Sequence, residues 1–147
     1  MTSDEQAIKN LLYRYCELQD AAEFVGVAEL FRHATYAVHN GDSHYGFDEV
    51  HALKTKHDKV YEDGTLRTKH VTVNSIIEVD GDAATARSYF IVLQATPALP
   101  LQIVIAGRYH DTFERADGAW RYTHRMIYGD LVGDLTQHLR DNPLDQQ

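Results

Sequence analysis

The chain has 147 residues, of which 22 are acidic and 14 are basic, so its formal net charge at pH 7 is −8. Hydrophobic residues make up 44% of it and charged residues 24%, which is ordinary for a soluble globular protein. This length suits one domain around a single hydrophobic core. The negative charge argues against nucleic acids and anionic membrane surfaces as partners.

Cysteine usage and the N-terminus bear on the cellular compartment. Cys16 is the only cysteine, so it has no internal disulfide partner, which fits a reducing cytosol. The N-terminus has neither a basic start nor an apolar stretch, so no signal peptide is expected. We therefore expect a cytoplasmic protein with a single domain over residues 1–133, followed by a loosely held polar tail over residues 134–147.

Helical periodicity dominates the first half of the chain. Ser3 and Gln6 form a capping box at the start of a helix that runs to Gln19, and further helices are predicted at about residues 21–32 and 47–62. Between the last two helices, a strand at residues 35–39 meets Asn40-Gly41, a hairpin signal, and a short strand with His44 and Tyr45 returns.

Strand alternation dominates the second half. Four long strands are predicted in meander order, at about residues 67–79, 83–95, 101–114 and 119–128. Strands of this length favour a strongly curved sheet with one face covered by the helices. The predicted class is therefore α+β, with an antiparallel or mixed sheet around a pocket that three N-terminal helices close.

Two residues suited to proton transfer lie at the ends of predicted elements. Asp20 either forms a capping box with Glu23 or points under the sheet and orients a histidine. His70 lies near the start of a long strand and shares a face with Thr72 and Asn74, so it is either an exposed strand histidine or a pocket base. A carboxylate on one ring nitrogen would fix the other nitrogen as an acceptor, ready to take a proton near neutral pH.

Arg125 lies on the last predicted strand. It either stabilises negative charge on a substrate or forms a cross-strand salt bridge with an acid such as Asp111. A three-residue loop at residues 116–118 would place Tyr109 opposite Arg125, whereas a two-residue loop would place His110 there. We favour the three-residue loop, which leaves Tyr109 in the pocket.

Other chemistry finds little support in the sequence. The remaining histidines form no HxH, HExxH or Cys-His grouping, so no metal is expected, and no phosphate-binding or serine-hydrolase motif is present. An aromatic cavity for a hydrophobic small molecule is consistent with a set of six aromatic residues: Tyr15, Phe24, Phe31, Tyr36, Phe90 and Tyr109.

Several short patterns follow one another in the order of the predicted elements. They are Ala7-Ile8 through Tyr15 to Asp20, residues 28–31, residues 70–74, residues 109–111, Glu114-Arg115 with Asp117-Gly118, and residues 120–125. Over about residues 5–130, this ordered set resembles the nuclear-transport-factor-2-like superfamily, and within it the SnoaL-like branch. The resemblance implies a cone-shaped α+β fold around a pocket, usually in a dimer.

The resemblance also implies site residues. Hexachlorocyclohexane dehydrochlorinase and scytalone dehydratase, two members of this superfamily, use a histidine–aspartate dyad for elimination without a cofactor. The dyad positions fall on His70 and Asp20, and the dehydrochlorinase's pocket arginine falls on Arg125. The dehydrochlorinase has a lysine where this chain has Tyr15, which argues against halide elimination and leaves a tyrosine to polarise a carbonyl or hydroxyl group.

The predicted function is that of a cofactor-independent lyase or isomerase acting on a hydrophobic, cyclic or aromatic small molecule. His70 would abstract a proton, Asp20 would hold its tautomer, and Arg125 with Tyr15 or Tyr109 would stabilise the resulting anion. The remaining predicted pocket residues are Phe31, Tyr36 and Thr72. Two alternatives stay open, a non-catalytic binding protein of the same fold and the small structural subunit of a ring-hydroxylating dioxygenase.

A homodimer through the convex face of the sheet is also expected. Strict alternation along the last strand places four large side chains on that face: Trp120, Tyr122, Met126 and Tyr128. A surface as apolar as this needs a cover, and a twofold partner would supply one.

Overall fold

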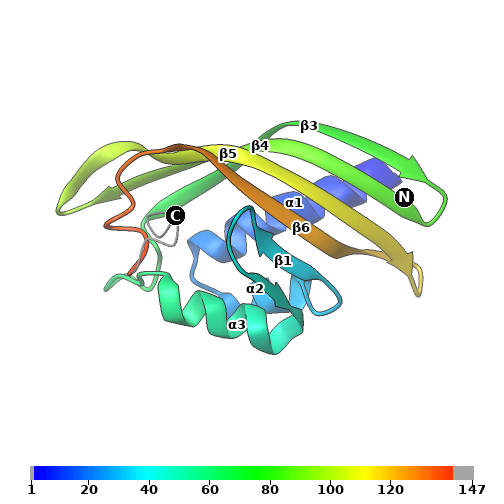
Figure 1. The fold of residues 1–147 in the computed structure, drawn as a ribbon, viewed down its shortest axis with the longest axis horizontal. Helices are drawn as coiled ribbons and strands as arrows, with labels where there is room; N and C mark the ends of the chain where they lie inside the picture. Colours follow the sequence, from blue (N-terminus) through cyan, green and yellow to red (C-terminus); the bar gives the residue numbers. More distant parts are fainter. Residues whose placement is uncertain (1, 141–147) are drawn as a thin grey trace.

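The computed structural model describes residues 2–140, with three helices on one side of a curved six-stranded sheet (Figure 1). The strand order is β2-β1-β6-β5-β4-β3, so the sheet is open, with β2 and β3 at its edges. Neighbouring strands are antiparallel except β1 and β6, which are parallel. The predicted α+β class with a mixed, curved sheet is confirmed.

The helices are α1 (Asp4–Asp20), α2 (Phe24–Leu30) and α3 (Gly46–His57). The Ser3 hydroxyl caps α1 by accepting a hydrogen bond from the Gln6 backbone N–H, as predicted. The buried side chains of α1 recur every three or four residues, which turns one face of the helix toward the sheet: Ile8, Leu12, Tyr15, Cys16 and Gln19. None of the three helices within residues 2–140 has the length and hydrophobicity that a membrane span requires.

Helix α3 ends five residues earlier than predicted. Asp58 adopts an extended backbone and forms a bridge with Leu139, while its carboxylate accepts a hydrogen bond from the Gln19 amide. These contacts stop the helix, and Tyr61 instead donates its backbone N–H to the Thr65 carbonyl in a loop. The prediction of a helix to residue 62 was therefore wrong.

The strands are β1 (Thr35–Val38), β2 (Ser43–Tyr45), β3 (Thr68–Asp80), β4 (Ala83–Thr96), β5 (Leu99–Ala116) and β6 (Ala119–Val132). The predicted four-strand meander is confirmed for β3 to β6. Alternate residues of β4 are buried under the helices, and they set the inner face of the sheet: Ala84, Ala86, Ser88, Phe90, Val92, Gln94 and Thr96.

The register of β5 and β6 differs from the prediction. Ala116 pairs with Ala119, so the turn has two residues, Asp117 and Gly118, both with positive φ. A bulge between Thr112 and Phe113 then shifts the register. As a result Asp111, rather than Tyr109 or His110, lies opposite Arg125.

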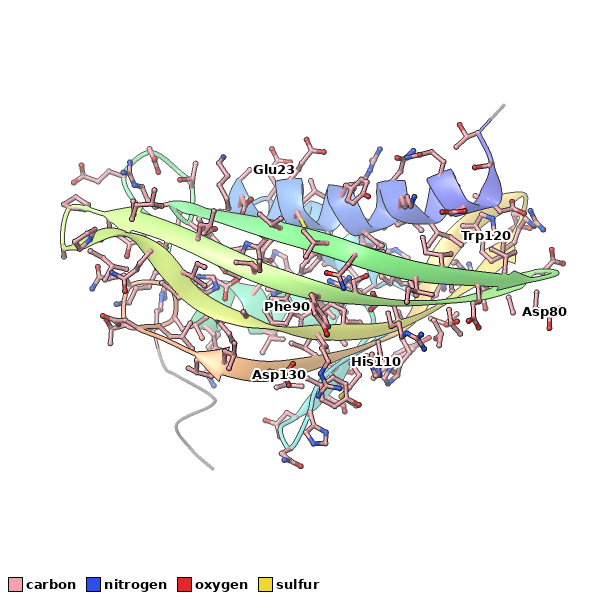
Figure 2. All side chains as sticks on the ribbon, turned by 90° about the horizontal axis from the view of Figure 1, so that it is seen from above. Glu23, Asp80, Phe90, His110, Trp120 and Asp130 are labelled. Carbon is pink, nitrogen blue, oxygen red and sulfur yellow. The ribbon has the colours of Figure 1, made fainter. Side chains whose placement is uncertain are left out.

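The same bulge changes which side chains of β6 face inward. Tyr122 and Arg125 are both fully buried, although strict alternation would put them on opposite faces. Trp120 also lies on the inner side, where its indole N–H donates to the Asp4 carboxylate near the start of α1 (Figure 2). The prediction that Trp120 and Tyr122 lie on the convex face was therefore wrong.

Residues 133–140, which we call the C-terminal strap, turn back after β6 toward the loop between α3 and β3 (red in Figure 1). Leu135 and His138 are buried, the Lys59 backbone N–H donates to the His138 carbonyl, and the Gln94 amide donates to the Gln137 carbonyl. Residues 134–140 are thus packed rather than loosely held, and residues 141–147 of the predicted tail lie outside the described residues.

Candidate functional site

A cavity of about 640 Å³ lies between the helices and the concave face of the sheet. The sheet supplies a largely apolar wall: Phe90, Val92, Ile105, Tyr109 and Ile127. Polar groups come from α1, from α3 and from Asp58 directly after it: Tyr15, Gln19, Lys54, His57 and Asp58. The strap closes part of the remaining wall with Leu135, His138 and Leu139. A cavity with one apolar and one polar side suits a small amphipathic molecule.

His70 and Asp20 form a dyad at this cavity. The His70 ring lines the cavity, and its Nδ1 lies 2.6 Å from the Asp20 Oδ1. The two side chains are 6% and 14% exposed. Asp20 also accepts hydrogen bonds from the His70 backbone N–H and from the Thr68 hydroxyl. The Thr68 hydroxyl and the His70 backbone N–H both donate to Asp20, so this side chain is an acceptor, and the contact with it favours the His70 tautomer that has its proton on Nδ1.

This arrangement decides between the two interpretations of Asp20. Glu23 precedes α2 without a side-chain cap, and the Asp20 carboxylate reaches β3 instead. The last turn of α1 thereby fixes both the backbone and the ring of His70. With Nδ1 donating to Asp20, Nε2 of His70 is left as a proton acceptor at the cavity.

A second histidine from the strap faces the first. The ring centroids of His138 and His70 lie 5.6 Å apart. His138 is 6% exposed, and its Nδ1 has no hydrogen-bond partner among the described residues. Burial, followed by the nearby His70, lowers the pKa of His138 to about 4. His138 is therefore a neutral imidazole at physiological pH.

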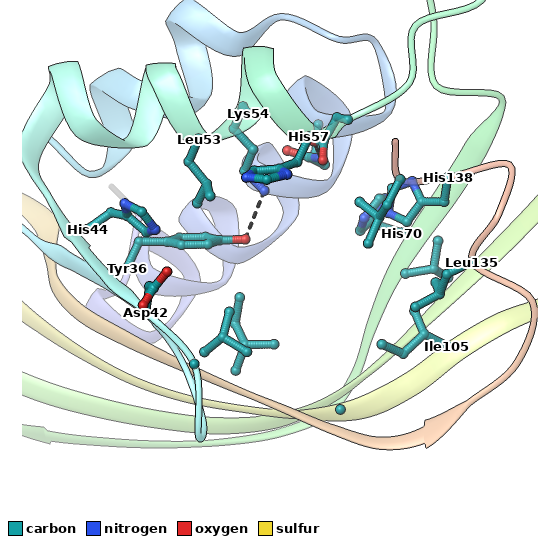
Figure 3. Close-up of a pocket in the computed structure, with 18 of the residues that line it drawn as sticks. Tyr36, Asp42, His44, Leu53, Lys54, His57, His70, Ile105, Leu135 and His138 are labelled. Atoms are coloured by element: carbon teal, nitrogen blue, oxygen red, sulfur yellow. Dashed lines mark hydrogen bonds between the residues drawn. The ribbon is translucent and has the colours of Figure 1, made fainter. Parts of the chain in front are cut away.

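Lys54 is a buried cation on α3. Its ammonium donates to the Tyr36 hydroxyl at 2.8 Å and to the Tyr15 hydroxyl at 3.3 Å, and those two hydroxyls lie 3.0 Å apart. Burial acts to lower the pKa of Lys54, but Tyr15, Tyr36 and Asp58 more than offset it, so the pKa is raised and the amine stays charged. Burial raises the pKa of Tyr15, which keeps this phenol protonated. Figure 3 shows Tyr36 and Lys54 across the pocket from His70 and His138.

Arg125 lies behind the cavity wall. Its guanidinium makes two hydrogen bonds to Asp111, at 2.8 and 3.1 Å, and both side chains are fully buried. It stacks on the ring of Tyr109, 3.7 Å from the centroid, and lies 4.4 Å from that of Tyr15. The predicted salt bridge with Asp111 is thus present, and Tyr15 and Tyr109 line the cavity whereas Arg125 does not.

Some of the other predicted pocket residues line the cavity and some do not. Tyr15, Tyr36 and Tyr109 line the cavity. Phe31 does not, because it packs behind Tyr15 and Tyr36, at ring-centroid distances of 5.9 and 5.2 Å. Thr72 shares the inner face with His70, as alternation predicted, but α1 covers it, and its hydroxyl lies 3.3 Å from the Cys16 thiol.

Three residues of the cavity wall were not predicted from the sequence: Lys54, Asp58 and His138. Lys54 follows the buried Val50 by four residues, so helical spacing alone would have placed it on the buried face of α3. A buried lysine at such a position is a signal of a charge held for function. For His138, the only sequence signal of burial is weak: it lies between two apolar residues, Leu135 and Leu139. Within residues 2–140, no three His, Cys, Asp or Glu side chains converge as a metal site requires.

Comparison with known proteins supplies the family. The SnoaL-like domain matches residues 1–126 of the 147. The chain belongs to the SnoaL-like domain family. The resemblance to that family stated from the sequence is confirmed, and this SnoaL-like protein has the expected nuclear-transport-factor-2-like fold. The strap lies beyond the matched residues. No curated protein matches the chain.

Solved structures share the fold. A protein of unknown function from Mycobacterium tuberculosis is 28% identical, with a TM-score of 0.73 over 86% of this chain and 71% of that one. A putative scytalone dehydratase from Novosphingobium aromaticivorans is 21% identical, with a TM-score of 0.72 over 89% and 87%. LinA is 18% identical, with a TM-score of 0.71 over 89% and 88%. At such identities, the last two establish the fold alone.

Proposed function

We propose that this SnoaL-like protein is a cofactor-independent lyase or isomerase in which His70 abstracts a proton from a hydrophobic, cyclic or aromatic small molecule. The observation that carries the proposal is the 2.6 Å contact between His70 and Asp20 at the wall of a cavity. A carboxylate held on Nδ1 orients the ring and stabilises the imidazolium that forms when Nε2 takes a proton.

The surroundings of the dyad support this role. The His70 side chain is nearly buried, and the ring that faces it, His138, is neutral. Tyr15 lies edge-on to the His70 ring, at a centroid distance of 6.3 Å, and carries its hydroxyl toward Tyr36 and Lys54. In this proposal Arg125 is a positioning residue, because its guanidinium holds the rings of Tyr15 and Tyr109 from behind.

Exchange of acidic C–H protons tests the proposal without knowledge of the natural substrate. The protein is incubated in D₂O with a panel of cyclic ketones and cyclic β-hydroxyketones, and loss of the α-proton signal is followed by ¹H NMR. We expect protein-dependent exchange that falls by about 100-fold or more in His70→Gln. Asp20→Asn should also slow exchange, because an amide no longer fixes the tautomer of His70.

The matched control is His110→Gln, which removes a histidine from the opposite face of the same sheet and should leave exchange unchanged. Equal exchange by the wild-type protein and His70→Gln would refute the role of His70. Binding of the ketones with no exchange would instead favour the non-catalytic binding protein, and copurification with a larger iron–sulfur protein would favour the dioxygenase subunit.

We also propose that two copies associate through the convex face of the sheet. With Trp120 and Tyr122 on the inner side, the exposed apolar residues of that face come mainly from the other strands: Val71, Ile76, Tyr89 and Ile103. Sedimentation should give the mass of a dimer for the wild-type protein and that of a monomer for the double variant Tyr89→Glu, Ile103→Glu. A monomeric wild-type protein would contradict this proposal.

A further inference from the structure

Lys54 is a buried charge that no carboxylate neutralises by direct contact. Its side chain is 6% exposed, its hydrogen bonds go to two phenol oxygens, and within residues 2–140 it takes part in no ion pair. The nearby Asp58 acts only through space, because its carboxylate binds Gln19. The direct partners of the ammonium are thus neutral phenols, and an anion placed against it would gain a direct charge–charge contact that the cluster itself does not supply.

The hydrogen-bonding capacity of this cluster is not used up. An ammonium has three N–H donors, and two of those of Lys54 point to Tyr15 and Tyr36. The two phenols share one hydrogen bond between them, which uses one of their two O–H groups. One N–H and one O–H therefore remain for a ligand. Two donors beside a positive charge match a single anionic oxygen.

The cavity specifies the rest of that ligand. All three cluster residues line it, and the facing wall is apolar and partly flat, with the rings of Phe90 and Tyr109 stacked at 4.4 Å. We propose that Lys54, Tyr36 and Tyr15 form an oxyanion-binding site for a cyclic or aromatic molecule whose oxygen is negatively charged when bound, as in a phenolate or an enolate.

This site also defines the substrate class, a step that rests on the proposed function. With a cyclic ketone, His70 takes the α-proton. The electron pair of the broken C–H bond forms a C=C bond, and the π electrons of the carbonyl group move to the oxygen that Lys54 holds. In elimination from a β-hydroxyketone, the enolate restores its C=O bond, the electron pair of its C=C bond forms a new Cα=Cβ bond, and the Cβ–O bond breaks. The departing hydroxyl takes the proton from His70 and leaves as water. In isomerisation, that proton returns at another carbon. Either route regenerates neutral His70.

The test uses 4-nitrophenol, whose anion absorbs at a longer wavelength than its neutral form. The wild-type protein should bind the anion and lower the apparent pKa of the bound probe below that of the free probe. Lys54→Met keeps the length of the side chain without the charge. It should weaken anion binding by about tenfold or more and abolish the shift. Tyr36→Phe removes one hydroxyl and should reduce the shift without abolishing it.

Two further variants separate this inference from the proposed function. Lys9→Met removes the same charge from the surface of α1, where Lys9 pairs with Glu5, and should bind the probe like the wild-type protein. His70→Gln should still bind the anion even if proton exchange is lost. The inference is overturned if the wild-type protein binds the neutral phenol, fails to bind the probe, or binds the anion no better than Lys54→Met. If Lys54→Met does not fold, the inference is overturned when Tyr36→Phe lowers the apparent pKa of the bound probe as much as the wild-type protein does.

Discussion

His138 should make the folded protein sensitive to acid. The ordinary pKa of a histidine is 6.5, and burial lowers that of His138 to about 4. Between these values the unfolded chain binds a proton at this position and the folded chain does not, so stability falls as the pH falls from about 6.5 to about 4. The titratable groups that face the ring are His70 of β3, Asp20 of α1, Lys54 of α3 and Asp58, which directly follows α3.

The size of the effect follows from the shift. Each unit of pKa corresponds to about 1.4 kcal/mol, so the full shift amounts to about 3 kcal/mol, of which about 2 kcal/mol is already lost at pH 5. For a chain of this length, 2 kcal/mol lowers the unfolding midpoint by about 6 °C. Above about pH 7, His138 is neutral in both states and contributes no pH dependence.

The assay compares the wild-type protein with His138→Leu by urea denaturation at pH 7.5 and at pH 5, using the fluorescence of Trp120. Many groups titrate between these values, so the informative quantity is the change in the difference between the two proteins. Between pH 7.5 and pH 5, the free energy of unfolding of the wild-type protein should fall by about 2 kcal/mol more than that of His138→Leu. A difference that is the same at both pH values would refute the reasoning, as would an NMR titration of His138 with a midpoint near 6.5. His110→Leu, at an exposed position, serves as the control.

Two further predictions concern the sheet. Asp111→Asn leaves Arg125 buried without a countercharge and should lower the free energy of unfolding by about 3–5 kcal/mol, and a loss below about 1 kcal/mol would contradict the buried ion pair. Gly107→Ala would place a Cβ 1.8 Å from the Tyr128 backbone oxygen and 2.8 Å from the Phe90 ring. The substitution should lower the free energy of unfolding, measured by urea denaturation, by about 2 kcal/mol or more. Wild-type stability would contradict this, because it would show that the backbone yields easily there.

Local patterns were sufficient to predict most of the fold. Alternation and the turns at Asp80–Asp82 and Asp117–Gly118 marked the long strands, and the apolar spacing of α1 marked its buried face. The faces of β6 could not be predicted, because one extra residue of β6, Thr123, opposite the step from Thr112 to Phe113, reverses the alternation and carries no sequence signature. The end of α3 was missed because its stop comes from the strap, which lies far away in the sequence.

The candidate site was predicted only in part, again because local patterns do not record contacts between distant parts of the chain. The contact between Asp20 and His70 was expected from the family resemblance, whereas local rules allowed a capping role for Asp20 equally well. Lys54 was not predicted because the apolar residues of α3 suffice to define a buried face, although a lysine one turn after Val50 lies on that same face. The distinction between Arg125, behind the wall, and Tyr109, on it, depends on packing that no linear pattern records.

The parallel pairing of β1 with β6 has a consequence for biosynthesis. It joins Thr35 to His124, and α1 is likewise tied to the end of the sheet through Asp4, which binds Arg115 and Trp120. Contacts between such distant parts of a chain form late, because their loops are long and closing them costs entropy. A nascent chain on the ribosome can therefore form α1 and the first hairpin early, but it cannot complete the sheet until β6 has emerged. The walls of the cavity come together only after β6 and the strap have emerged, so the unfinished chain exposes the apolar surfaces that will later line the cavity.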